Sequence, residues 1–336
     1  MSKDSTTTDN GTTKSTTIHI PSITQISRPF FSNKEISFLH SQTISDSLKL
    51  HYKSTKDQVF QLLFQICKSM KFPLRMLSTA MNYYQRYYLF NKFELNSNDI
   101  LDDPYLISLS CLFLASKVED CIKKLKDFQQ TYNKIKNIDE SISIDNLSFL
   151  EYQRKALLQI ECKLLQIIKF DFNLGNNHPS IKMNIDYLLI QFCKQLKINY
   201  KISILSWFIQ FDIIQTPLCL VIPPHCIAVG IIIVALNLKP KELHIEDNTD
   251  DDYDEILNSI DCERLNCPEV LVNESIIYIL DYYIHQYNNS ILKNYLPEKD
   301  PITNKDQVFN FMNLKTKFND LQDLCYQIKE KDFIQN

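Results

Sequence analysis

One hydrophobic stretch organises the first half of the chain. Between Tyr105 and Val118, apolar and small residues fall on every face of a helix and not on a single stripe. A helix with this pattern is buried on all sides. Asp103 can cap it, and Pro104 fits its first turn, where a missing N–H costs nothing. The stretch is shorter than the roughly 20 residues that span a bilayer, so we expect it to form the centre of a helical domain.

Amphipathic patterns on both sides of this stretch predict the helices that surround it. Ser32 and Glu35 form a capping-box pattern that opens an N-terminal helix toward Leu50. Asp145 is a candidate cap for the last helix of the group, and Gly175 marks a break after it. Apolar residues at helical spacing predict the following further helices: 55–70, 73–88, 123–132 and 146–169.

The same succession of patterns then returns. Pro223 and Pro224 open a second all-apolar helix that ends near Leu238, and placing Pro104 on Pro224 gives an offset of 120 residues. This alignment puts Asn237 at the position of Lys117. Helices are predicted around it at 186–196, 202–214 and 270–287, with an additional amphipathic helix at 306–329. We interpret the pattern as an internal duplication of a five-helix unit.

These patterns predict an all-α protein of two tandem units with terminal extensions. The first 25 residues are rich in Ser and Thr and cannot bury enough apolar surface to fold. Acidic residues cluster after the second apolar helix, and such a cluster is usually a solvated loop. The expected division is a disordered tail at 1–25, a first unit at 26–173, a second at 174–295 with an acidic insert at 242–258, and a helical extension at 296–336.

Composition narrows the classes of function. The 336 residues include only three glycines, which disfavours a β-rich fold and a phosphate-binding glycine loop. The net charge is −4 and only five residues are arginine, which disfavours direct nucleic-acid binding. The ten cysteines contain no C-x-x-C pair, and we interpret Cys219/Cys226 and Cys262/Cys267 as reduced core residues without metal-ligand spacing.

No local motif supports catalysis. The sequence shows no Ser/His/Asp or Cys/His constellation, and we expect neither a catalytic residue nor a cofactor nor a metal. The N-terminus has no apolar segment of the kind found in secretory signals, and the most lipid-like run, from Leu218 to Leu238, is interrupted by two prolines and a histidine. We therefore expect a non-enzymatic protein that does not insert into a membrane.

Three stretches carry a resemblance to a known family. The central helix ends in Leu114–Asp120, and the fifth helix contains Leu158–Leu165 and closes with Phe170–Phe172. Together with the duplicated five-helix pattern, these stretches resemble the cyclin box over roughly residues 27–290. Ser27–Ser32, with Phe72–Pro73 and Tyr84–Glu94, resembles the transcriptional cyclins (T, K, C and H), and in particular the cyclin, or beta, subunits of fungal RNA polymerase II C-terminal-domain kinase I.

The resemblance implies a regulatory role. Such a subunit binds and activates a cyclin-dependent kinase, which phosphorylates serines in the heptad repeats of the polymerase tail during elongation, in the nucleus and with the cytoplasm as a further location. The complex also contains a third, gamma, subunit. By correspondence with the family, five residues of this sequence face the kinase: Phe113, Lys117, Asp120, Glu161 and Phe170. The apolar substrate-docking motif of mitotic cyclins is absent, because Lys56–Phe60 occupies its place.

Two interpretations of the charged residues remain open. Leucines flank Glu161 at three and four positions along its helix, so its carboxylate needs a partner, which is either a residue of this chain or a group of a bound protein. Lys117 stands in the last turn of its helix, where lysines commonly complement the helix dipole. We expect Glu119 and Asp120, which follow it, to be solvated.

Two other classes of protein compete with the cyclin interpretation. A general transcription factor of the same double fold would bind DNA and polymerase, but that group usually carries an N-terminal zinc ribbon, and no cysteine precedes Cys67 here. An all-helical enzyme is the third possibility, and the missing active-site motifs count against it.

Overall fold

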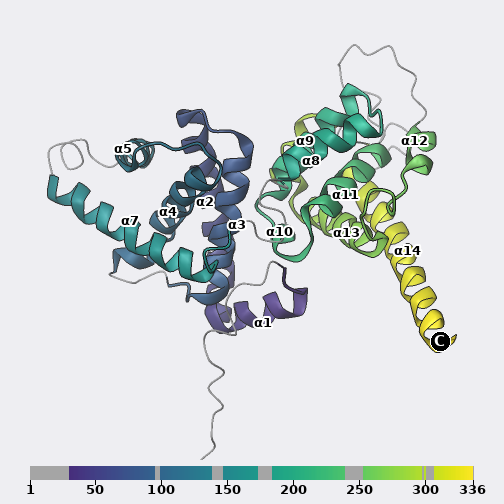
Figure 1. The fold of residues 1–336 in the computed structure, drawn as a ribbon, viewed down its shortest axis with the longest axis horizontal. Coiled ribbons are helices and arrows are strands. Elements are labelled where there is room, and N and C mark those ends of the chain that lie inside the picture. Colours follow the sequence, from purple (N-terminus) through teal and green to yellow (C-terminus); the bar gives the residue numbers. More distant parts are fainter. Residues whose placement is uncertain are drawn as a thin grey trace, which may run out of the picture.

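The computed structural model describes residues 30–94, 99–137, 147–172, 184–238, 253–296, 299 and 306–335. Over these residues the chain is helical, and the only β pairing between described residues is an isolated antiparallel bridge between Lys299 and Asp306. Figure 1 shows two helical groups side by side, the first in purple to teal and the second in green to yellow. The predicted all-α fold of two tandem units is confirmed.

The first of the two units, here called repeat one, is built around α4 (Pro104–Val118), which lies at its centre as predicted. Asp103 caps this helix by accepting a hydrogen bond from the Tyr105 N–H at 3.0 Å, and every residue from Leu106 to Ser116 is buried. The helices that pack on α4 are α2 (Lys49–Met70), α3 (Leu74–Phe90), α5 (Leu125–Ile135) and α7 (Leu147–Ile167).

The second unit, here called repeat two, likewise surrounds a central helix, α11 (Pro224–Asn237), which is apolar on all faces and almost entirely buried. Its neighbours are α8 (Ile185–Gln195), α9 (Tyr200–Ile213), α12 (Tyr253–Ser259) and α13 (Glu269–Gln286), with the short α10 (Leu218–Val221) before it. The last helix, α14 (Gln307–Gln335), packs along α13 and then extends away from the repeat (Figure 1).

The N-terminal helix is shorter than predicted. The capping box of Ser32 and Glu35 is present and opens α1 (Asn33–Thr43), but α1 ends seven residues before Leu50. The Thr43 hydroxyl donates to the Tyr88 carbonyl at 2.7 Å, and Ile44 is extended and 3% exposed. This anchoring to α3 stops α1, so the next long helix, α2, begins at Lys49 and not at residue 55.

Other predictions are modified in detail. The helix predicted to reach Lys169 ends at Ile167, because Lys169 and Phe170 adopt left-handed backbone angles with φ of 53° and 58°. Tyr253–Ser259, which overlaps the end of the expected solvated insert, forms α12. The cap at Asp145, the break at Gly175, residues 1–25 and most of the acidic insert lie outside the described residues.

The two repeats meet through α3 and the N-terminal segment on one side and α8 to α10 on the other (Figure 1). Phe211 of α9 packs edge-on against Phe60 and Phe64 of α2, with ring centroids 5.4 and 5.2 Å away. The Phe31 N–H donates to the Leu220 carbonyl at 2.8 Å. Among the described helices, none is both long and apolar enough to cross a membrane.

Candidate functional site

Lys117 and Glu161 lie side by side on the surface of repeat one. Lys117 is in the last turn of α4 and Glu161 is on α7, and the lysine Nζ is 2.6 Å from the carboxylate Oε1. The Glu161 side chain is 8% exposed, whereas that of Lys117 is 43% exposed. The carboxylate therefore has its partner within the chain, and the ammonium group retains open N–H directions toward solvent.

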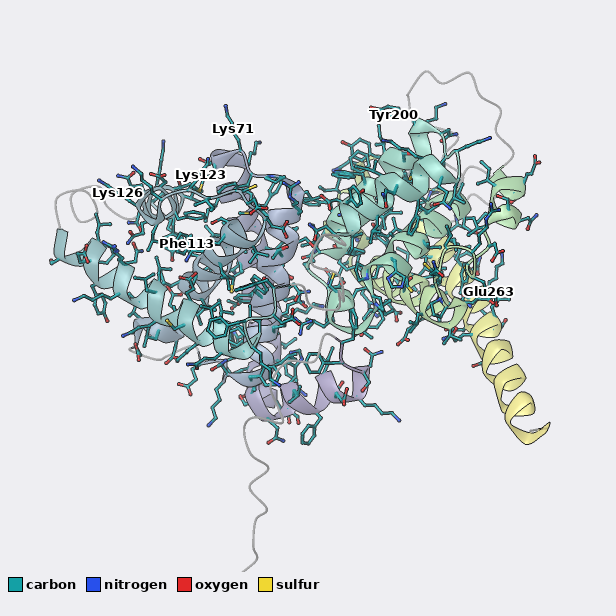
Figure 2. All side chains as sticks on the ribbon, in the orientation of Figure 1. Lys71, Phe113, Lys123, Lys126, Tyr200 and Glu263 are labelled. Carbon is teal, nitrogen blue, oxygen red and sulfur yellow. The ribbon has the colours of Figure 1, made fainter. Side chains whose placement is uncertain are left out.

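Phe113 forms the apolar floor beside this ion pair. It is one turn before Lys117 on α4, is 8% exposed, and its ring centroid is 4.2 Å from the lysine Nζ. This arrangement is a cation–π contact. Phe128 of α5 supports the ring from below in an edge-on contact at 5.4 Å. Figure 2 shows Phe113 between α4 and α5, close to the face where Lys123 and Lys126 project outward.

The other two predicted residues flank this cluster along the chain. Asp120 is exposed and has a left-handed backbone with φ of 55°, two residues after the end of α4. Phe170 follows the end of α7 and is 63% exposed, which is unusual for a phenylalanine. The structure thus brings Lys117 into direct contact with both Phe113 and Glu161, and it places Asp120 and Phe170 just beyond the ends of α4 and α7.

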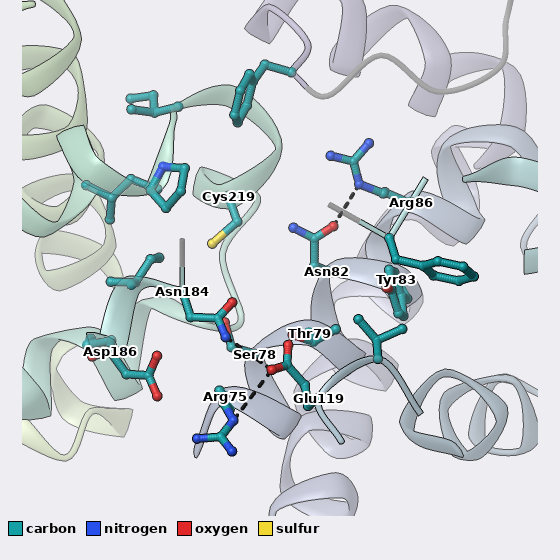
Figure 3. Close-up of a pocket in the computed structure, with 18 residues that line it drawn as sticks. Arg75, Ser78, Thr79, Asn82, Tyr83, Arg86, Glu119, Asn184, Asp186 and Cys219 are labelled. Carbon is teal, nitrogen blue, oxygen red and sulfur yellow. Dashed lines mark hydrogen bonds and ion pairs between the residues drawn. The ribbon is translucent and has the colours of Figure 1, made fainter. Parts of the chain in front are cut away.

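The prediction that Glu119 is solvated is wrong. Glu119 is 4% exposed and lies in a cavity of about 140 Å³ between the two repeats, shown in Figure 3. Its Oε1 accepts from Thr79 at 2.8 Å, and its Oε2 accepts from Asn184 at 3.1 Å and lies 3.5 Å from Nε of Arg75. Because these partners come from α3 and from the residue that precedes α8, Glu119 ties repeat one to repeat two.

A second buried charge lies deeper in the same cavity. Arg86 of α3 is 1% exposed and donates from Nε to Oδ1 of Asn82 at 2.7 Å (Figure 3). Burial lowers the pKa of Arg86 to about 10, so the guanidinium stays charged at neutral pH. The ring of Phe31 lies 5.7 Å away. Sequence reasoning missed this residue because its neighbours in α3 are aromatic and give no sign of a buried cation.

Repeat two contains a buried carboxylate with an architectural role. Asp212 of α9 is 2% exposed and accepts hydrogen bonds from the backbone N–H groups of Ile291 and Leu292 and from the Tyr283 hydroxyl, at 2.8, 3.1 and 3.1 Å. Burial raises the pKa of Asp212 to about 6 in spite of these three donors. Asp212 thereby fixes the segment that follows α13 to the core.

One cluster of side chains among the described residues has the chemistry of a metal site. A ring nitrogen of His225 and the sulfurs of Cys226 and Cys267 all lie within 4.8 Å of one another. The sequence predicts reduced core cysteines without metal-ligand spacing, and no local motif connects His225 and Cys226 with Cys267, which is 41 residues after Cys226.

Comparison with known proteins identifies the family to which the chain is similar. The family described as cyclin, N-terminal domain, matches residues 27–173. The chain is 32% identical over 271 residues to CTD kinase subunit beta of Saccharomyces cerevisiae, covering 81% of this chain and 75% of that protein. It is 27% identical over 285 residues to CTD kinase subunit beta of Schizosaccharomyces pombe, covering 84% and 75%.

A solved structure extends the similarity to three dimensions. A chain in the crystal structure of the yeast RNA Pol II CTD kinase CTDK-1 complex matches with a TM-score of 0.69 and 31% sequence identity, covering 87% of this chain and 84% of that one. The similarity therefore includes both repeats and not only the part matched by the family description. On the fold, the duplicated helical plan and these relatives, the chain belongs to the cyclin family.

Proposed function

We propose that this chain is the regulatory cyclin subunit of a cyclin-dependent kinase that phosphorylates the C-terminal repeat domain of RNA polymerase II and thereby supports transcription elongation in the nucleus. The relatives named as CTD kinase beta subunits support this assignment. The chain itself supplies no catalytic group in the proposal. Its role is to bind the kinase subunit and hold it in its active conformation.

The observation that carries the proposal is the cluster of Phe113, Lys117 and Glu161. A half-exposed lysine is held at a fixed position by a carboxylate that is 8% exposed and by an aromatic ring. Such preorganised groups lose little conformational entropy when they bind a partner. The free N–H directions of Lys117 point to acceptors on a partner, such as the carbonyl groups at the end of a helix.

A contact of this kind explains activation by binding alone. An active protein kinase needs its αC helix turned inward, so that a glutamate on it pairs with the lysine that holds the ATP phosphates. In our proposal the cluster on repeat one binds the αC segment and favours this inward position. Asp120 and Phe170 lie at the rim of the contact, where the exposed ring of Phe170 becomes covered by the kinase.

A third, gamma, subunit is proposed to bind repeat two and α14. The supporting feature is that α14 keeps three apolar side chains exposed to solvent: Phe309 at 38%, Met312 at 48% and Leu321 at 36%. The buried face of α14 packs on the core of repeat two through Phe311, which stacks on Tyr283. The test is therefore the double substitution Met312→Lys and Leu321→Lys, which leaves Phe311 in place and should weaken capture of the third subunit. Unchanged capture would contradict this part of the proposal.

The decisive experiment is reconstitution of the kinase with a peptide of several polymerase heptad repeats. We expect the kinase subunit alone to turn over slowly and the added chain to raise phosphate incorporation in a saturable manner. The variants Lys117→Ala and Glu161→Ala should shift the activation curve to higher concentrations. The control is Lys315→Ala, because Lys315 forms an ion pair with Asp281 in repeat two, away from the cluster of Phe113, Lys117 and Glu161.

Two outcomes would contradict the proposal. One is activation that is unaffected by either substitution in repeat one, and the other is failure of the wild-type chain to copurify with any kinase. A salt-sensitive shift of duplex DNA by the isolated chain would instead favour the general transcription factor of the same fold.

A further inference from the structure

The cluster of His225, Cys226 and Cys267 is separate from the surface proposed to bind the kinase. Cys226 and Cys267 are both 0% exposed, and a ring nitrogen of His225 lies within 4.8 Å of their sulfurs. The Nδ1 atom of His225 is buried and has no hydrogen-bond partner among the described residues. A buried ring nitrogen without a partner is costly, which is why such atoms in proteins are normally paired or bound to an ion.

Two segments of repeat two bring these donors together. His225 and Cys226 lie in the first turn of α11, immediately after the two prolines that open it. Cys267 lies just before α13, whose first turn begins after Pro268. The backbone that carries His225 and Cys226 is thus held at the start of α11, and the backbone that carries Cys267 is held just before the start of α13. These two helix starts fix the positions of the three donors.

A tight turn joins Cys267 to a further cysteine, Cys262, whose sulfur is not among the three donor atoms that lie within 4.8 Å of one another. The Cys267 N–H donates to the Cys262 carbonyl at 2.8 Å, and Asn266 completes the turn with a left-handed φ of 54°. The carboxylate of Asp261 accepts from the backbone N–H groups of Glu263 and Arg264, at 3.0 and 3.1 Å. Glu263 marks this turn on the outer side of repeat two in Figure 2. Four residues separate Cys262 from Cys267, at the upper limit of the spacing that zinc sites use, so the interpretation of this pair from the sequence as lacking metal-ligand spacing was too strict.

We propose that His225, Cys226 and Cys267 bind a zinc ion, with the sulfur of Cys262 as the fourth ligand. Thiolate sulfur and imidazole nitrogen are the ligands that structural zinc sites use, in tetrahedral sets such as three cysteines and one histidine. Bond lengths of about 2.1 to 2.3 Å in a tetrahedron place ligand atoms roughly 3.5 to 3.8 Å apart, which is compatible with the spread of up to 4.8 Å seen here. The oxygen-preferring ions calcium and magnesium do not suit this donor set.

The ion would have a structural role in repeat two. It would fasten the start of the central helix α11 to the turn that leads into α13, in a repeat whose helices α11 and α13 pack closely against each other. Binding of a metal to a folded site adds its binding free energy to the free energy of folding. The proposal does not depend on the kinase function, because the cluster and the Lys117–Glu161 pair lie in different repeats.

The test measures zinc in the full-length chain, expressed with zinc in the medium and purified without chelator. We expect about one zinc ion per chain by inductively coupled plasma mass spectrometry, and we expect Cys267→Ser and His225→Asn each to lose most of this zinc. Replacement by Co²⁺ should give the visible absorption of a tetrahedral site with sulfur ligands. The control is Cys193→Ser, which removes another buried cysteine of repeat two that lies outside the cluster.

A second measurement guards against variants that do not fold. Adding a chelator to the wild-type chain should lower its melting temperature, and this shift should be absent in Cys267→Ser and present in Cys193→Ser. Less than one zinc per ten chains in the folded wild-type protein would overturn the site, as would a disulfide between Cys226 and Cys267 in freshly prepared protein. Full zinc content in Cys262→Ser would overturn the assignment of the fourth ligand.

Discussion

The two repeats place different residues at the same position of their central helices. In repeat one, Lys117 near the end of α4 reaches across to Glu161 on α7. In repeat two, the residue 120 positions later is Asn237, whose side chain donates to the Ile233 carbonyl of its own helix at 2.8 Å. The first side chain bridges two helices and presents a cation to solvent, whereas the second is folded back on α11.

The partner position differs in a complementary way. Asp281 follows Glu161 by the same 120 residues, and it pairs with Lys315 of α14. Repeat two thus satisfies this carboxylate with its own additional helix, which packs along α13. The comparison indicates that one helical scaffold carries two surfaces, of which repeat one leaves its surface open for another protein and repeat two covers its surface with α14.

The largest expected effect is on kinase binding. Removing one member of a desolvated charged contact costs roughly 2–5 kcal/mol, so we expect Glu161→Ala and Lys117→Ala to weaken kinase affinity by about 30-fold to several thousand-fold. Asp281→Ala, the corresponding change in repeat two, should leave that affinity within about threefold. Titration of each chain against the kinase by calorimetry or interferometry measures the difference.

Melting of the free variants separates this prediction from a purely internal role of the pair. Melting close to that of the wild-type chain, together with lost binding, supports a contact with the kinase. If Glu161→Ala instead lowers the melting temperature strongly and keeps its kinase affinity at a permissive temperature, the pair serves only to stabilise repeat one.

The next effect is on the pH dependence of stability. One buried group in each repeat contributes to it, and the two contributions change with pH in opposite directions. The pKa of Asp212, raised by burial to about 6, lies above the ordinary value of 3.8, so its contribution to stability is full below pH 3.8 and is lost as the pH rises through 6. Burial, with Lys56 and Lys49 nearby, lowers the pKa of His40 to about 4, so its contribution is present above pH 6.5 and is lost as the pH falls through 4.

Unfolding by urea between pH 7.5 and 4 tests this opposition. Relative to Asp212→Asn, the wild-type chain should gain on the order of 2–3 kcal/mol as the pH falls over this range. Relative to His40→Gln, the wild-type chain should lose stability over the same range. A difference between wild type and Asp212→Asn that does not change with pH would show that Asp212 titrates near its ordinary value in the folded protein.

Most of the helical plan follows from the sequence, because burial of α4 and α11 on all sides leaves an unmistakable apolar pattern. The helix ends that were predicted wrongly are set by features that the local pattern does not contain. The Thr43 hydroxyl ends α1 by bonding to Tyr88, and no local pattern announces this bond. The left-handed turn at Lys169 and Phe170 likewise ends α7 without a glycine to indicate it.

The candidate site was predictable only in part, for the same reason. Leucines around Glu161 showed that its carboxylate needs a partner, and the structure identifies Lys117 as that partner. Glu119 carried no such sign, because Thr79, Arg75 and Asn184 approach it from other helices. The proximity of Cys267 to His225 and Cys226 could not be predicted, since these residues come together only through the fold.

Packing of the central helix against the fifth helix gives a further contrast between the repeats. A methyl group added at Gly230 of α11 would lie 2.0 Å from the Ser275 Oγ of α13, so the Ser275 hydroxyl fills the space that a side chain at position 230 would need. At the corresponding position of α4, Ser110 fits and donates to the Leu157 carbonyl at 2.9 Å. Gly230→Ala should cost roughly 1–3 kcal/mol by overpacking, and Ser110→Ala about 1 kcal/mol through its lost hydrogen bond.

A double-substitution cycle sharpens this contrast. In a chain that carries Ser275→Ala, the hydroxyl that the new methyl group meets is gone, so Gly230→Ala should cost less than it does in the wild-type background. Equal costs in both backgrounds, measured by urea unfolding, would mean that the two helices shift apart and that Ser275 does not set their distance.

The smallest expected effect comes from giving repeat two the lysine of repeat one. Asn237→Lys restores the residue that stands at the end of α4, but the carboxylate that would hold it, Asp281, is already paired with Lys315. The new side chain therefore extends into solvent, where a single lysine changes stability by less than about 0.5 kcal/mol. We expect both the variant and the wild-type chain to bind one kinase per chain when stoichiometry is measured by analytical ultracentrifugation. Binding of a second kinase would mean that the lysine alone defines the contact, and that coverage by α14 does not distinguish the repeats.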